Sequence, residues 1–515
     1  MNLPRCFLRV AAVIAVLAGF SLPAHATINY TISLARPDQH RFHVRMAIPG
    51  ATGNLEVQMA AWDALYQIRD FAARVIGLHA EDAAGPVVVE KVDKETWKIK
   101  AAGTVTVEYD TEWNDPGPFA SQLDREHAFI NFAMVLLYLP ERHREDVRVR
   151  FLDVPEGWRI AVELQPDSAD ASGQTIAASS FDALADAPAE LGIFDDFSFN
   201  AGGRTLRVVV RGKGWNRADI TDALTRIANY ETSLMGGPPD KEYMFLFDIG
   251  FGWGGGMEHS DCAAISIATA AQLPDTSAHE FFHQWNVKRL RPRSLEPVDR
   301  TREMWTRALW FAEGVTNTYA HYTLVRTGLF SPRQFYDALA EEYGEVEARP
   351  AHLWMSAEEA SLNAWFEKYP LYNEPDFSVS YYNKGDVIGV ALDIVLREAS
   401  NNRVSLDDVM RQMYDDFAKK GRFYNDSADI RATAEALLRR AGVPAASTDL
   451  GSFFAQYVSG AKEIPFADIL SEAGLELQTI EGGGIPVYRI VETSHPTDLQ
   501  LGIRNGLLLG RTSQP

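Results

Sequence analysis

Residues 277–286 read Ser-Ala-His-Glu-Phe-Phe-His-Gln-Trp-Asn and contain the pattern His-Glu-X-X-His. On a helix, His279 and His283 lie one turn apart on one face, so both imidazoles can reach the same zinc ion. Glu280 points to the neighbouring face, where its carboxylate can hold a water on that metal. The pattern therefore predicts a metal site that still needs a third protein ligand, a wall for a peptide and an oxyanion donor.

The apolar residues of this stretch argue against an exposed helix. Phe281, Phe282 and Trp285 give it too much apolar surface to face water. Histidines on a buried helix need polar partners, because an unpaired buried polar group is costly. We therefore expect the two imidazoles to share a partner rather than to be solvated.

A third ligand is expected from the segment that follows the zinc helix. Glu313 stands beside Trp310 and Phe311, and a carboxylate among such residues needs a cation. His259 and His321 are weaker alternatives. Three protein ligands leave one position open for water, which is typical of catalytic zinc sites. Glu280 would then be the general base that takes a proton from this water and hands it to the leaving amine.

A glycine-rich stretch precedes the zinc helix. Residues 254–259 read Gly-Gly-Gly-Met-Glu-His, and Gly255 and Gly256 would let a peptide backbone approach closely. Glu258 is placed to pair with a cation, and the cation that a peptide offers is its free α-amine. This interpretation predicts an aminopeptidase; the alternative is a glycine turn with an exposed glutamate.

Two tyrosines precede an apolar helical pattern at residues 384–400. A tyrosine hydroxyl aimed at the metal can stabilise the oxyanion of a tetrahedral intermediate. We assign this role to Tyr382 and hold Tyr381 as the alternative. Both can instead be core aromatics whose hydroxyl groups are satisfied elsewhere.

Composition limits the class of protein. The chain has 515 residues, which predicts two or three domains, and its formal net charge of -21 makes a nucleic-acid partner unlikely. Its two cysteines are Cys6 and Cys262. Because Cys6 falls in the N-terminal leader described next, no intrachain disulfide is expected in the mature protein.

The N-terminus has the pattern of a secretory signal. Arg5 and Arg9 are followed by an apolar run at residues 10–22 and an Ala-His-Ala cleavage site at residues 24–26. We expect residues 1–26 to be removed, so that the mature protein is periplasmic or secreted by a bacterium and has no membrane anchor. The alternative is an uncleaved N-terminal anchor.

Periodicity divides the mature chain into an α+β multidomain protein. Alternating strand patterns predict a β-rich, sandwich-like N-terminal domain over residues 27–190. Helical patterns dominate a catalytic domain over residues 191–460, including expected helices at residues 277–288 and 304–326. Residues 461–515 form a C-terminal segment.

The sequence also resembles a known family. Its zinc helix is similar to the signature of the glycyl aminopeptidase family, in the gluzincin class. Three further motifs follow the family's order: Gly-Gly-Met-Glu-His, Trp-Phe-Ala-Glu-Gly-Val-Thr and Tyr-Asn-Lys-Gly, which begin at residues 255, 310 and 382. The resemblance runs from about residue 28 to residue 480.

The resemblance implies a thermolysin-like zinc peptidase domain with one zinc ion per chain. It implies removal of N-terminal residues, with glycine and alanine preferred, from peptides with a free N-terminus. Carried over to this sequence, the roles are those of metal ligands (His279, His283 and Glu313), general base (Glu280), oxyanion donor (Tyr382) and amine anchor (Glu258).

Two departures from the family pattern stand out. Residues 61–66 lack the Pro-Gly turn that family members often carry in the N-terminal domain. Family members often carry a C-terminal PDZ domain, but only about 50 residues follow Pro465 in this sequence. That is roughly half of what a PDZ domain needs. Residues 501–506 are therefore interpreted as a remnant before a missing or truncated PDZ domain.

Two other functions remain open from the sequence. One is a zinc endopeptidase of the same class, in which Glu258 only bonds substrate backbone. The other is a non-catalytic peptide-binding protein on a peptidase scaffold. Neither the residue preferred at the cleaved position nor the oligomeric state follows from the residues.

Overall fold

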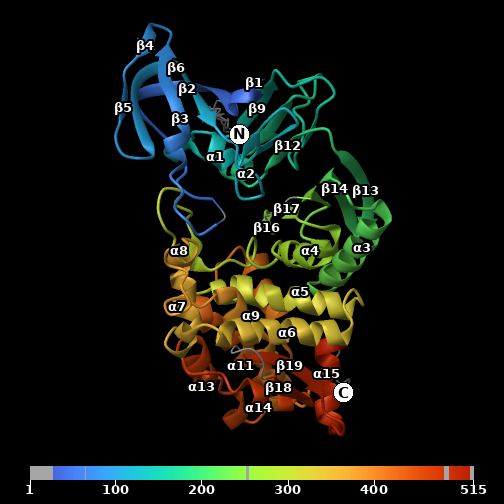
Figure 1. Cartoon of the computed structure of the whole chain (residues 1–515). Helices are drawn as coiled ribbons and strands as arrows, with labels where there is room; N and C mark the ends of the chain where they lie inside the picture. Colours follow the sequence, from blue (N-terminus) through green and yellow to red (C-terminus); the bar gives the residue numbers. More distant parts are fainter. Residues whose placement is uncertain (1–26, 64, 251–253, 481–485, 511–515) are drawn as a thin grey trace, which may run out of the picture.

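The computed structural model describes residues 27–63, 65–250, 254–480 and 486–510. The predicted signal peptide, residues 1–26, lies outside the described residues. Figure 1 shows a β-rich N-terminal part in blue and teal, a mixed region in green, and a mainly helical part in yellow to red. The predicted α+β organisation is confirmed. Across the described ranges, no helix combines the length and the apolar character needed to span a membrane.

An eight-stranded sheet forms the body of the N-terminal part. Its strand order is β11-β9-β1-β2-β6-β3-β4, and β5 also pairs with β6. The small, polar residues at 166–180 predict a connecting loop, but the segment contributes β11, whose buried Thr175 and Ile176 pair with β9. The strands are β1 Ile28–Arg36, β2 Arg41–Gln58, β3 Val75–Asp82, β4 Gly85–Val87, β5 Val89–Lys91, β6 Thr96–Glu112, β9 Val147–Leu152 and β11 Thr175–Ala178.

A smaller sheet connects this part to the catalytic part. Its order is β10-β12-β8-β7, formed by β7 Gln122–Leu123, β8 His127–Ile130, β10 Arg159–Ala161 and β12 Ala189–Gly192. Ala161 from β10 and Phe129 from β8 belong to an apolar cluster with Val209, Leu246 and Ala264 of the next sheet. Apolar burial therefore joins the two parts across this interface.

The mixed sheet carries the edge strand beside the zinc helix. Its order is β13-β14-β15-β17-β16, with β14, β15 and β17 parallel and β16 antiparallel at the edge. One face of this mixed sheet contacts the smaller sheet, and its other face packs on helices α3 and α4. The elements are β13 Asp195–Ala201, β14 Arg204–Gly212, β15 Glu242–Ile249, β16 Gly255–Glu258, β17 Cys262–Ile267, α3 Arg217–Leu234 and α4 Leu273–Phe282.

Helices α5, α6 and α9 form the central layer of the helical part, and Figure 1 shows them stacked below α4. The longer helices are α5 Val315–Arg326, α6 Pro332–Glu347, α9 Tyr381–Ala399, α10 Leu406–Asp416, α11 Asp426–Arg440 and α15 Asp498–Leu509. The shorter ones are α1 Phe132–Val135, α2 Phe181–Ala185, α7 Ala357–Leu362, α8 Ala364–Glu367, α12 Ala445–Thr448, α13 Gly451–Phe453 and α14 Phe466–Ser471. Strands β18 Leu475–Ile480 and β19 Val487–Glu492 pair as a hairpin.

The two helices that carry the predicted metal ligands differ from their expected bounds. Helix α4 begins at Leu273, with a proline in its first turn, and ends at Phe282 instead of residue 288. The expected helix at residues 304–326 is helical only from residue 310, and Trp310–Gly314 form a π-helical turn before α5. Such turns are rare and often mark functional sites, and local sequence periodicity does not predict them.

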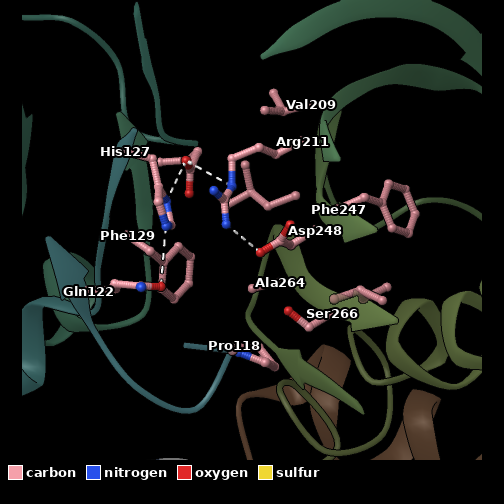
Figure 2. A pocket seen from close by; sticks show the side chains of 14 residues that line it. Pro118, Gln122, His127, Phe129, Val209, Arg211, Phe247, Asp248, Ala264 and Ser266 are labelled. Carbon is pink, nitrogen blue, oxygen red and sulfur yellow. Dashed lines mark hydrogen bonds and ion pairs between the residues drawn. The ribbon is translucent and has the colours of Figure 1, made fainter. Parts of the chain in front are cut away.

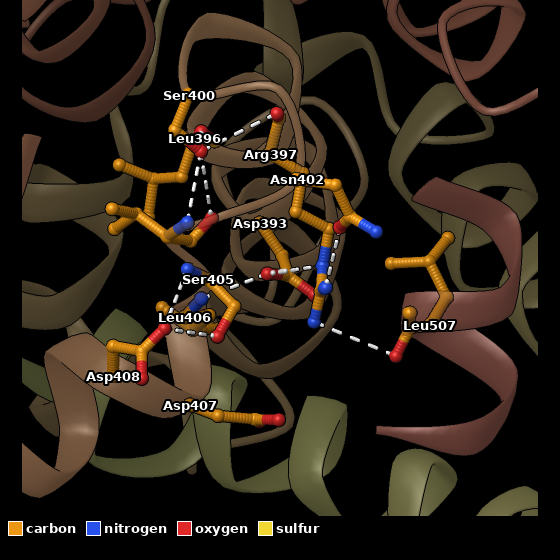
Figure 3. A network of polar contacts seen from close by, with 12 residues as sticks. Asp393, Leu396, Arg397, Ser400, Asn402, Ser405, Leu406, Asp407, Asp408 and Leu507 are labelled. Carbon is orange, nitrogen blue, oxygen red and sulfur yellow. Dashed lines mark hydrogen bonds and ion pairs between the residues drawn. The ribbon is translucent and has the colours of Figure 1, made fainter. Parts of the chain in front are cut away.

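The C-terminal segment packs on the catalytic helices. Helix α15 includes residues 501–506, which the sequence suggested as the approach to a PDZ domain, and it contacts α5 and α9. Arg397 of α9 is fully buried, pairs with Asp393 at 3.0 Å and donates a hydrogen bond to the Gly506 carbonyl oxygen. Figure 3 shows the Arg397 side chain between Asp393 and this helix. The segment is thus fixed to the catalytic part by buried polar contacts.

Replacing Arg397 with alanine is expected to lower the free energy of unfolding by about 3–5 kcal/mol, because Asp393 would keep a buried charge without its cation. The control is Arg226→Ala on α3, which removes an exposed pair of the same spacing with Asp222 and should cost less than about 1 kcal/mol. Urea denaturation followed by tryptophan fluorescence measures both variants. Equal losses would contradict the structural role given to Arg397.

Candidate active site

The three predicted metal ligands meet at one point between α4 and the π-helical turn. The Nε2 atoms of His279 and His283 lie 2.9 Å apart. Glu313 Oε2 lies 3.6 Å from His279 Nε2 and 3.2 Å from His283 Nε2. Four tetrahedral ligands at about 2.0–2.1 Å from zinc are spaced about 3.3–3.4 Å apart, so these donors fit one zinc ion.

The chemistry of the donors supports the same conclusion. Two neutral imidazoles that face each other with their lone pairs repel unless a cation lies between them. Burial alone would lower the pKa of His283, but the Glu313 carboxylate outweighs it and raises that pKa to about 10. Burial alone would raise the pKa of Glu313, yet the two imidazoles hold it well below its usual range. The site is therefore built to stabilise positive charge.

A second layer of contacts orients the ligands. His283 is the C-cap residue that follows α4, and its Nδ1 lies 2.7 Å from the Asn286 carbonyl oxygen. This contact places the proton on Nδ1 and leaves Nε2 as a metal donor. The Asn286 side chain donates to the Phe311 carbonyl oxygen at 2.9 Å, which ties α4 to the turn that carries Glu313. Sequence reasoning missed Asn286, although it lies in the stretch that first indicated the site.

Glu280 lies against the edge strand of the mixed sheet. The carboxylate is almost fully buried, and the absence of a Cβ on Gly256 makes room for it: a Cβ there would lie 2.2 Å from Glu280 Oε1. Burial raises the pKa of Glu280 well above its usual value, and Glu258 and Glu313 add to this while His283 opposes it. A buried, basic carboxylate beside a metal site is suited to general base catalysis.

Glu258 reaches the same centre from β16. One ligand atom of each of Glu258, Glu280 and His283 lies within 4.8 Å of the others. Glu258 also lines a cavity of about 240 Å³ with Trp62 and Tyr66 of the N-terminal part. Trp62, Asp63 and Tyr66, from the stretch where the sequence departs from the family pattern, thus form part of this cavity's wall. This stretch and Glu258 are far apart in the chain, so no local sequence pattern predicts that they line the same cavity.

The predicted tyrosines sit at the start of α9. The Tyr382 ring lies 6.2 Å from the His279 ring, centroid to centroid, whereas Tyr381 is fully buried and its hydroxyl has no hydrogen-bond partner among the described residues. A close contact between two glycines brings α9 this near. A Cβ on Gly314 would lie 2.4 Å from the Cα of Gly385, so only glycine allows the approach. The geometry favours Tyr382 over Tyr381 as the residue beside the metal ligands.

The alternative ligands lie in other environments. His259 is buried with its Nδ1 3.3 Å from Asp186. His321 is 3.0 Å from Asp386, and Glu342 joins these two in a separate cluster between α5, α6 and α9. Neither histidine joins the group of His279, His283 and Glu313.

A second cavity lies between the smaller sheet and the mixed sheet (Figure 2). Its polar wall runs through His127, Glu190, Arg211 and Asp248, with His127 Nδ1 3.0 Å from Glu190 and Arg211 2.6 Å from Asp248. Its volume of about 30 Å³ is enough for a water molecule but not for a peptide. None of the predicted site residues lines it, so it is separate from the metal site.

Comparison with known families agrees with this geometry. The model for the peptidase M61 N-terminal domain matches residues 29–193, and the model for M61 glycyl aminopeptidase matches residues 272–388. Together these matches cover more than half of the chain. The chain belongs to the M61 glycyl aminopeptidase family. It is a metallopeptidase of the aminopeptidase type.

Solved structures share the fold of this M61 chain. An aminopeptidase N family protein from Idiomarina loihiensis is 25% identical with a TM-score of 0.82, and the alignment covers 89% of this chain and 82% of that one. An M1 zinc metallopeptidase from Deinococcus radiodurans is 13% identical over 85% and 95%, with a TM-score of 0.52. Yeast LTA4 hydrolase is 12% identical over 87% and 70%, with a TM-score of 0.50. No curated protein matches the chain by sequence.

The contact between Gly256 and Glu280 allows a direct check of the site. Gly256→Ala is expected to lower kcat by about 10²-fold, because the new Cβ would displace the carboxylate of Glu280, the predicted base, while the three predicted metal ligands stay in place. Gly254→Ala is the matched control, since a Cβ there would meet no atom closer than 3.9 Å. Steady-state kinetics and metal analysis of both variants provide the readout. Retention of the parent kcat by Gly256→Ala would contradict the assigned position of Glu280.

Proposed function

We propose that this M61 chain is an exported zinc aminopeptidase that removes N-terminal residues from peptides through attack by water. The observation that carries the proposal is the convergence of the two histidines and Glu313 with two further carboxylates, those of Glu280 and Glu258. Three ligands bind a metal and leave a position open, and the other two carboxylates supply a base and an anchor for an amine.

The metal would be held by His279, His283 and Glu313. When bound, zinc supplies a Lewis acid that polarises a carbonyl oxygen and makes water more acidic. Glu280 accepts the proton of the attacking water at its carboxylate and delivers it to the nitrogen of the leaving amine. The Tyr382 hydroxyl donates a hydrogen bond to the developing oxyanion. Burial raises the pKa of Tyr382, so this hydroxyl keeps its proton at neutral pH.

Glu258 makes the site selective for a free N-terminus. Glu258 forms no ion pair within 4 Å among the described residues. Two other acidic residues of its cavity do have partners: Asp186 pairs with Lys288, and Glu296 pairs with Arg291. An α-ammonium group can therefore take this position, close to Glu280. The family resemblance implies glycine and alanine as the residues removed, and Gly255 and Gly256 form the strand along which the substrate backbone would lie.

Export and stoichiometry complete the proposal. The basic residues, apolar run and Ala-His-Ala site within residues 1–26 support secretion to a bacterial periplasm or beyond. One cluster of two histidines and a glutamate with zinc-like spacing supports about one zinc ion per chain.

The test compares alanyl peptides with free and with acetylated N-termini, each with and without a chelator. We expect hydrolysis of the free peptides only, and its loss on chelation. Equal cleavage of free and acetylated peptides would favour the endopeptidase alternative, and an unchanged rate after metal removal would overturn the zinc mechanism.

A further inference from the structure

One lysine beside the active-site tyrosines has no carboxylate partner. Lys368 follows helix α8, and its Nζ lies 5.1 Å from the centre of the Tyr382 ring and 5.5 Å from that of Tyr381. Its side chain forms no hydrogen bond or ion pair within 4 Å among the described residues. Glu367 is adjacent in sequence and interacts with it only at longer range. The ammonium group therefore contacts aromatic faces in place of a carboxylate.

The backbone around Lys368 is fixed from two sides. The Gln67 side chain donates to the Lys368 carbonyl oxygen at 3.4 Å, and the Tyr369 hydroxyl donates to the Ile68 carbonyl oxygen at 2.8 Å. Trp365 on α8 donates to the Met304 carbonyl oxygen at 3.1 Å. These contacts join α8 to the N-terminal part and to the loop before the π-helical turn. They hold the lysine at the edge of the site.

Acidic side chains gather at the proposed metal site. Glu258, Glu280 and Glu313 converge there, and the cations of the adjoining cavity are paired: Lys288 with Asp186, Arg291 with Glu296. Lys368 differs from these cations because no acidic side chain neutralises it at short range. An unpaired cation at a binding site is a specificity feature only if the substrate brings an anion.

We infer that Lys368 binds a carboxylate of the peptide substrate and so makes this enzyme prefer acidic or very short peptides. The inference rests on the proposed function. With the scissile carbonyl at Tyr382, the terminal carboxylate of a dipeptide lies one residue further, about 3.5 Å along the chain. The side-chain carboxylate of an N-terminal glutamate extends over a comparable distance. Either group falls within reach of the flexible Lys368 side chain.

Two substrate pairs separate these sources. Ala-Ala and its C-terminal amide differ only in the terminal carboxylate, whereas Glu-Ala-amide and Gln-Ala-amide differ only in the side-chain charge. For each pair the readout is the ratio of kcat/KM for the acid to kcat/KM for the amide. In Lys368→Met one of the two ratios is expected to fall about tenfold, through KM, because a charge-assisted hydrogen bond is lost. The pair that responds identifies the carboxylate.

Controls distinguish binding from a structural role. Lys368→Arg keeps the cation and should preserve the ratio, and Lys419→Met, at an exposed lysine paired with Asp415, should keep the parent values. In the parent enzyme, added salt should raise KM for the responding acid more than for its amide, which tests the inference even if Lys368→Met does not fold. A uniform loss of kcat on all four substrates, or unchanged ratios without a salt effect, would overturn it. If the parent hydrolyses none of the four, the proposed function itself is wrong.

Discussion

The Glu280→Gln variant is expected to lose activity by about 10²- to 10⁴-fold in kcat while it keeps its bound zinc. Glutamine has nearly the shape of glutamate, so it can occupy the space beside Gly256, but it cannot accept the proton of the attacking water. The proposed metal ligands are His279, His283 and Glu313, and the substitution changes none of them. Steady-state kinetics with an aminoacyl amide and metal analysis of the same sample measure both quantities.

Asp275→Asn is the matched control for this variant. It removes a carboxylate from an exposed position of the same helix, one turn before His279, and should keep kcat within about threefold of the parent. Loss of activity in Glu280→Gln only is the expected pattern. Unchanged activity in Glu280→Gln would contradict the role of this residue, whereas a parent without any peptidase activity would favour a non-catalytic peptide-binding protein.

Glu313→Ala is expected to weaken zinc binding by more than about 100-fold and to abolish activity. Outer contacts to metal ligands are worth about 10- to 100-fold in affinity, and a direct ligand contributes more. Without this carboxylate, only the two imidazoles remain as proposed ligands, with their Nε2 atoms 2.9 Å apart, and the negatively charged ligand is lost. Competition with a chromophoric chelator measures the affinity.

Glu342→Gln separates the metal site from the other cluster of acidic and histidine residues. Glu342 lies with His321 and Asp386 between α5, α6 and α9, and its substitution leaves the three predicted ligands unchanged. We expect this variant to bind zinc as the parent does. If Glu342→Gln lost zinc and Glu313→Ala kept it, the metal would be bound by the cluster of His321, Glu342 and Asp386. That result would contradict the assignment of His279, His283 and Glu313 as ligands.

The sequence predicted the metal triad because each ligand stands in a short local pattern. His279 and His283 need only the helical repeat, and Glu313 was indicated by its apolar neighbours in the sequence. The structure brings these residues together with Glu280 and Glu258, as the sequence interpretation expected. The choice of Tyr382 over Tyr381 needed the folded structure, because the two tyrosines are neighbours at the start of α9 and the position of the Tyr382 ring relative to His279 separates them.

Features that depend on distant segments were missed. The π-helical turn at Trp310–Gly314 and the contact of Gly314 with Gly385 arise where two helices meet, so no local pattern contains them. Tyr66 and Lys368 belong to different parts of the chain, and only the folded structure places both near the active-site tyrosines. The strand at residues 175–178 lies among small, polar residues that predict a loop, and its four residues are too few for a clear strand pattern.

The most direct measurement is the zinc content of the purified parent enzyme together with its aminopeptidase activity before and after chelation. The account predicts about one zinc ion per chain, loss of activity when the metal is removed, and recovery when zinc is restored. A chain that contains no zinc and still removes N-terminal residues at the same rate would contradict the account.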